Sequence, residues 1–134
     1  VTTLLYDPAH TPDRTAEEFD SFVRLAGGRP LAFNEVFTPG SPLGGRSEEA
    51  QAEFVRELFK AMTKHEKSLA WCTWWCLRDD SVENWQFLGE YLAGGKGPSA
   101  NAFRAFAPCG LLRGDGTAKP ATLEWAKGAA GLPR

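Results

Sequence analysis

Hydrophobic periodicity along the chain predicts an alternation of strands and helices. Apolar or β-branched runs at 1–6, 29–37 and 69–77 are typical of strands, whereas 15–26 and 47–62 carry apolar residues at helical spacing. A helix between two such strands normally makes them parallel neighbours in one sheet. The sequence therefore predicts an α/β fold, one domain in which parallel strands alternate with helices.

The ends of the two helices carry recognisable signals. Thr15 and Glu18 form a capping box at the start of the first helix, and the pair 27–28, two glycines, predicts where it stops. Ser47, followed by two glutamates, is expected to cap the second helix. These signals set the predicted boundaries.

The third strand is a nearly continuous apolar run, which is typical of a parallel strand buried on both faces. A period of two predicts that Trp71, Thr73 and Trp75 lie on one face and that Cys72, Trp74 and Cys76 lie on the other.

Beyond this strand the pattern weakens. We expect a short helix over 82–92, one or two helical turns over 99–106, and a tight turn at 114–116. A last helix is predicted from Pro120 or Ala121 through Lys127. Gly128 and Gly131 are expected to end it.

Composition and charge narrow the function classes. A content of 43% hydrophobic residues is that of a globular protein with a core. The 15 basic and 17 acidic residues give a formal charge of -2 without a block of like charge, so nucleic acid is not an expected partner. No apolar run approaches the ~20 residues of a membrane span, so no membrane partner is expected either.

The three cysteines suggest neither a disulfide framework nor a metal site. In an extended strand Cys72 and Cys76 would be roughly 13 Å apart, beyond disulfide reach, and we interpret them as core thiols. Cys109 follows in a loop and is either free or paired. No metal and no cofactor are expected, and the compartment stays open with a secreted location slightly favoured.

Polar residues follow each predicted strand, and Glu35 is the candidate catalytic residue. The pairs 6–7 and 78–79 and the carboxylate of Glu35 would meet at the carboxyl rim of a parallel sheet, where α/β enzymes place their chemistry. The alternative is a strand-end carboxylate that pairs with Arg29, with Arg78 or with solvent.

Several motifs resemble the C-terminal part of clan A glycoside hydrolases, the family 5-like (β/α)8 barrels. They are Tyr6-Asp7-Pro8, Asn34-Glu35-Val36, Glu49-Ala50-Gln51-Ala52, the segment 74–79 (Trp-Trp-Cys-Leu-Arg-Asp), Gly110-Leu111, Asp115-Gly116-Thr117 and Lys119-Pro120. The resemblance implies a partial TIM barrel whose three strands are the sixth, seventh and eighth.

The resemblance also implies roles for individual residues. Glu35 matches the nucleophile, Tyr6 the tyrosine that orients it, and Trp75 or Trp74 the tryptophan beneath the sugar, with Asn34 and Asp79 as further substrate-binding residues. A retaining glycosidase also needs a proton donor about 5–5.5 Å from its nucleophile. In the family this donor ends strand four, which is not in this sequence, and Leu4 replaces a histidine that family 5 members often have.

Two function classes follow. One is the nucleophile half of a retaining hydrolase of β-glycosides or β-glycans, and the other is a non-catalytic carbohydrate-binding or scaffold protein on a decayed barrel. Because Val1 enters a strand directly, we expect a fragment whose partner is a missing N-terminal barrel half or a second copy of itself. Alone, the 134-residue chain is expected not to hydrolyse glycosides.

Overall fold

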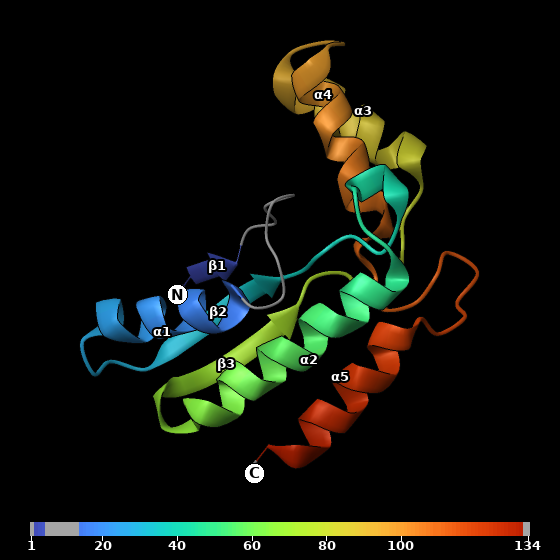
Figure 1. Cartoon of the computed structure of the whole chain (residues 1–134). Coiled ribbons are helices and arrows are strands. Elements are labelled where there is room, and N and C mark those ends of the chain that lie inside the picture. The colour runs from blue at the N-terminus through green and yellow to red at the C-terminus, as the bar shows by residue number, and fades with distance from the viewer. Residues whose placement is uncertain (1, 5–13, 133–134) are drawn as a thin grey trace.

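The computed structural model describes residues 2–4 and 14–132 and contains one parallel sheet. Its strands are β1 (Thr2–Leu4), β2 (Leu31–Val36) and β3 (Leu69–Trp74), in the spatial order β1-β2-β3 (Figure 1). The predicted parallel arrangement is therefore confirmed for the described part of the chain. Tyr6 and Asp7 lie outside the described residues.

Three helices cover one face of this sheet. They are α1 (Arg14–Ala26), α2 (Glu48–Lys64) and α5 (Pro120–Gly131), with α2 between the other two (Figure 1). Phe33 of β2 is fully buried against the ring of Phe19 from α1, with ring centroids 4.8 Å apart. The core lies between the helices and this face of the sheet.

The ends of α1 and α2 agree with the sequence signals except at one point. The Ser47 hydroxyl accepts a hydrogen bond from the amide of Ala50 at 3.2 Å, which confirms the cap of α2. Gly27 and Gly28 follow α1 with φ of 58° and 83°, the left-handed region that glycine enters at little cost. The predicted cap at Thr15 is wrong, because α1 already begins at Arg14 and Thr15 lies in its first turn.

The opposite face of the sheet is not covered by any described helix, which corrects the prediction for β3. Trp74 faces the helices and is 8% exposed, whereas Trp71 on the other face is 52% exposed. Thr73 is exposed as well. The third strand is thus buried on one face, although its apolar run is typical of strands buried on both.

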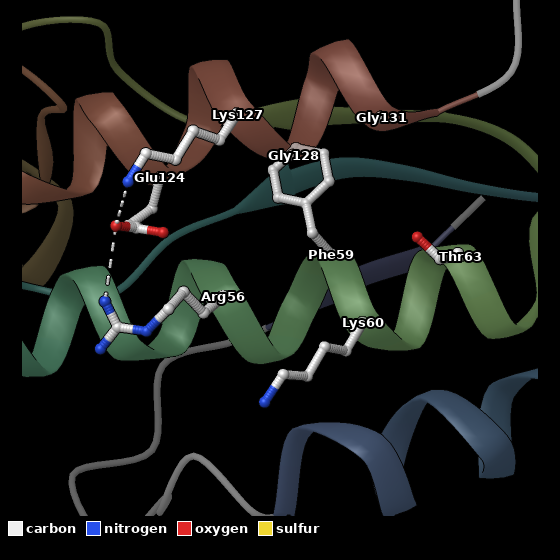
Figure 2. Close-up of a pocket in the computed structure, with 8 residues that line it drawn as sticks. All are labelled: Arg56, Phe59, Lys60, Thr63, Glu124, Lys127, Gly128 and Gly131. Atoms are coloured by element: carbon white, nitrogen blue, oxygen red, sulfur yellow. Dashed lines mark hydrogen bonds and ion pairs between the residues drawn. The ribbon is translucent and has the colours of Figure 1, made fainter.

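Helix α5 continues through the glycine that was predicted to end it. Figure 2 shows the ring of Phe59, from α2, directed at Gly128 of α5. A Cβ atom at Gly128 would lie 2.2 Å from Cγ of Phe59, so the glycine permits the two helices to approach. The helix ends three residues later, at Gly131. Beside this contact Glu124 pairs with Arg56 and Lys127.

A second group of helices follows β3 and projects away from the sheet (Figure 1). It comprises α3 (Val82–Ala93), α4 (Pro98–Ala102) and the 3-10 helix η3 (Phe103–Cys109), which also contacts η1 (Pro42–Gly44). A further 3-10 helix, η2 (Glu66–Ser68), precedes β3. No helix in the described ranges is long and apolar enough to cross a membrane.

All three cysteines are free thiols. Cys109 is fully buried, while Cys72 and Cys76 are half-buried. Cys76 lies after the end of β3 and has a φ of 66°, so the strand stops before it instead of continuing to residue 77 as predicted.

Candidate functional site at the carboxyl ends of strands β2 and β3

The carboxyl ends of β2 and β3 lie side by side. The amide of Trp75 donates a hydrogen bond to the carbonyl oxygen of Val36 at 3.0 Å, so the two chains stay paired just beyond the strands. Glu35 is the last residue but one of β2, and Trp75 directly follows β3. The structure therefore brings these two predicted site residues to neighbouring strand ends.

An irregularity in β2 turns two consecutive polar residues to solvent. Phe33 pairs with Cys72 and Val36 with Trp74, so β2 has one more residue than β3 between the paired positions. Such a bulge breaks the strict alternation of a strand. As a result Asn34 and Glu35 are both exposed, while the residues on either side of them are buried.

The Glu35 carboxylate makes no hydrogen bond or ion pair with any other described residue. The expected alternative partner Arg29 instead directs its Nε to the carbonyl oxygen of Ala26 at 3.1 Å. Arg78, the other candidate partner, is paired through its backbone with Leu112 and makes no ion pair with Glu35 among the described side chains. Glu35 is thus a strand-end carboxylate that is open with respect to the described side chains.

Asn34 has a partner on the open face of the sheet. Its Oδ1 accepts a hydrogen bond from Nε1 of Trp71 at 3.2 Å. Trp71 was expected to be a core residue, and the sequence gives one signal for its true position, namely the period of two that puts it on the face opposite Trp74. A half-exposed indole therefore lies next to Asn34.

The two candidate sugar-stacking tryptophans have different surroundings. Trp75 is half-buried in an aromatic cluster, with ring centroids 5.0 Å from Phe37 and 5.2 Å from Trp85. Trp74 is buried, and its Nε1 donates to the carbonyl oxygen of Cys109 at 2.9 Å. Trp74 was the alternative candidate for a substrate-binding residue, and its indole packs against Phe54 of α2 and Trp125 of α5.

Asp79 is held from two sides. Its Oδ1 accepts from Nζ of Lys119 at 2.6 Å and from the amide of Gly110 at 2.8 Å. The neighbouring Asp80 accepts from the amide of Ser81 at 2.7 Å and from the side chain of Asn84. Both carboxylates of this loop therefore bind protein groups.

An open pocket of about 390 Å³ lies where these residues meet. It is lined by Trp75, Cys76, Arg78, Asp79, Asp80 and Trp85. Two indoles, carboxylates and a guanidinium are groups that can stack on and hydrogen-bond to a polar organic ligand. Trp85 and Arg78 were not expected in this role, because their place depends on the turn at Cys76.

One predicted site residue remains outside this geometry. Tyr6, expected to orient Glu35, lies outside the described residues. Across the described ranges no group of three or more His, Cys, Asp or Glu side chains is arranged to hold a metal ion.

No protein-family model and no curated protein matches this sequence. Solved structures do. A GH5_18 protein from Streptomyces cattleya, in complex with GlcNAc, matches with a TM-score of 0.60 and 23% identity over 93% of this chain. A GH5_18 variant from Bifidobacterium longum subsp. longum, in complex with Manb1-4GlcNAc, matches with a TM-score of 0.61 and 20% identity over 93% of this chain.

A GH5_18 protein from Bifidobacterium longum subsp. infantis gives a TM-score of 0.59 with 21% identity over 88% of this chain. The described chain has the fold of part of a GH5_18 glycoside hydrolase. It spans 26%, 27% and 25% of the three solved chains, about a quarter of each. At these identities the likeness concerns the fold.

Proposed function

We propose that this sequence forms the last three βα units of a (β/α)8 barrel, with strands six to eight, in a retaining glycoside hydrolase whose nucleophile is Glu35. The observation that carries the proposal is the open carboxylate of Glu35 at the carboxyl end of the central strand, beside the end of β3. The shared fold with GH5_18 glycoside hydrolases supports it.

In the proposed reaction a carboxylate oxygen of Glu35 attacks the anomeric carbon of a β-glycoside. The bond from that carbon to the leaving oxygen breaks as the oxygen takes a proton from a general acid, and water then hydrolyses the glycosyl ester. Asp79 and Asp80 are engaged by protein donors. We therefore assign the acid/base to a barrel segment outside this sequence.

The other rim residues would hold the sugar. The half-buried indole of Trp75 offers an apolar surface for the C–H face of a pyranose, and Asn34 offers an amide to its hydroxyls. Asp79 would act from the pocket beside Trp75, and Tyr6 would donate to Glu35 and favour its charged form. Because two neighbours were crystallised with Manb1-4GlcNAc, this disaccharide is the first substrate to test.

A covalent trap tests the role of Glu35. The protein expressed from its whole reading frame is incubated with 2-deoxy-2-fluoro-β-mannosyl fluoride, whose fluoride leaves without a general acid. We expect peptide mass spectrometry to find one glycosyl group, on Glu35, and Glu35→Gln to remove it. Glu53→Gln, which alters an exposed carboxylate on α2, is the matched control and should label normally.

A label on another carboxylate would refute the assignment of Glu35. Binding of Manb1-4GlcNAc by calorimetry without any label would instead support the second function class, a carbohydrate-binding protein without catalysis. Both results are measured on the same preparation, so a failure of folding is recognised by the absence of both.

A further inference from the structure

Two polar side chains are fully buried beneath the rim of the sheet and have no role so far. The side chain of Lys119 is 1% exposed, and Gln51 is 0% exposed. An ammonium group is costly to bury unless it is paired and hydrogen-bonded. Their burial therefore points to a specific use of their donors.

Lys119 connects the loop after β3 with the end of η3. Its Nζ donates to Oδ1 of Asp79 at 2.6 Å and to the carbonyl oxygen of Pro108 at 3.0 Å. The same Pro108 oxygen accepts from the amide of Gly40, in the loop after β2, at 2.8 Å. The Lys119 ammonium thus contacts the loop after β3 directly, and it is connected to the loop after β2 through the shared carbonyl oxygen of Pro108.

Gln51, on α2, makes the second connection. Its Nε2 donates to the carbonyl oxygen of Thr38 at 2.9 Å and to that of Gly110 at 3.2 Å. Gly40 lies closely over both side chains, because a Cβ atom there would be 2.8 Å from Oε1 of Gln51 and 3.2 Å from Nζ of Lys119. The loop after β2 is therefore packed directly onto this network.

The network begins only a few residues beyond the proposed reacting groups. Thr38 follows Glu35 after two intervening residues, and Asp79 follows Trp75 after three. Between Trp75 and Asp79 the backbone of Cys76 adopts a φ of 66°, which an L residue keeps only when its surroundings impose it. Asp79, held by Lys119, anchors the far side of this turn.

We infer that Lys119 and Gln51 are positioning residues, which lock the two strand-end loops together and thereby fix the Glu35 carboxylate relative to the face of Trp75. The inference rests on the proposed function. Lys119 and Gln51 lie behind the proposed site and are not proposed to touch the substrate. Their proposed effect is on the orientation of the Glu35 carboxylate.

The test separates the rate of the trapping step from binding. In the whole protein, kinact and KI for 2-deoxy-2-fluoro-β-mannosyl fluoride are measured for the unaltered protein and for Lys119→Met. Because small errors in the position of a reacting group cost much of its rate, we expect kinact to fall at least about tenfold while KI changes little. Gln51→Met, which leaves no buried charge behind, should act in the same direction.

A double variant separates positioning from stability. In Lys119→Met the Asp79 carboxylate loses its buried cation, and adding Asp79→Asn removes that charge while keeping an acceptor for the amide of Gly110. We expect the double variant to recover Tm but to keep a kinact well below that of Asp79→Asn alone, which is the reference because Asp79 is also proposed to bind the sugar, since the connection to Pro108 is still missing. The control is Lys127→Met, whose side chain is 71% exposed and pairs with Glu124.

The outcomes distinguish the two proposals. If the unaltered protein is not labelled on Glu35, the proposed function fails. If it is labelled and Lys119→Met has an unaltered kinact, or if kinact returns together with Tm in the double variant, the positioning role is overturned and Lys119 is purely structural.

Discussion

At the scale of single residues, the Cys72 thiol is expected to make the stability of the folded protein fall at alkaline pH. Cys72 lies among Phe59, Met62 and Trp125, and burial raises the pKa of its thiol from 9.0 to about 12. The folded state keeps this proton above pH 9, whereas the unfolded chain loses it there. Stability is therefore lost as the pH rises from 9 toward 12.

The measurement is urea unfolding at pH 8 and pH 10. One group with these two pKa values lowers the free energy of unfolding by about 1.4 kcal/mol over that interval. Cys72→Ala should abolish this contribution, so its free energy of unfolding should fall by that much less than the unaltered protein's. Equal losses in the two proteins would show that Cys72 ionises alike in both states.

The residue scale also shows what sequence could and could not establish about the site. Glu35 became the candidate because a carboxylate at the end of an apolar strand is unusual, and its place near the end of β2 is confirmed. Its exposure was not foreseen, since the bulge at 34–35 depends on pairing with β3. The choice between Trp74 and Trp75 likewise depended on where β3 ends, which no local pattern determined.

At the scale of elements, the contact between α2 and α5 depends on one glycine (Figure 2). Gly128→Ala would place a methyl group 2.2 Å from Cγ of Phe59. Helix propensity alone favours alanine by about 1 kcal/mol, but forced overpacking typically costs about 1–3 kcal/mol. We expect a net loss of stability, measured by thermal unfolding.

Two further variants test whether the contact with Phe59 is the cause of this loss. Gly131→Ala, at the last residue of α5 where a Cβ atom meets nothing within 4 Å, should not lower Tm and can raise it slightly. Phe59→Leu should relieve part of the clash when combined with Gly128→Ala, so the two changes should be non-additive. A Gly128→Ala protein more stable than the unaltered one would refute the close contact.

Elements were predicted well where their signals are local. Ser47 capped α2 as expected because its hydroxyl reaches an amide only three residues away. Gly128 was misjudged as a helix end because a glycine that ends a helix and a glycine that admits a neighbouring ring look alike in sequence. Only the packing of Phe59 distinguishes them.

At the scale of the whole molecule, the described helices cover only one face of the sheet. The apolar run of β3 predicted two covered faces, and the helices α1, α2 and α5 supply one of them. The second face of β3 carries Trp71 and Thr73, and both side chains are exposed in the described chain. The sequence thus anticipated burial that residues 2–4 and 14–132 do not provide by themselves.

This uncovered face predicts that the 134-residue chain, expressed alone, associates with itself. Parallel sheets are normally covered on both faces, and β1 and β3 form the two edges of the described sheet, so other copies can bury Trp71 and pair with a strand edge. Sedimentation velocity should show a mass that rises with concentration.

Thr73→Lys, which puts a charge on this face, should lower that mass, whereas Thr63→Lys on the exposed surface of α2 should not. A monomer at every concentration, unfolding cooperatively, would mean that the uncovered face needs no partner and would count against a barrel fragment.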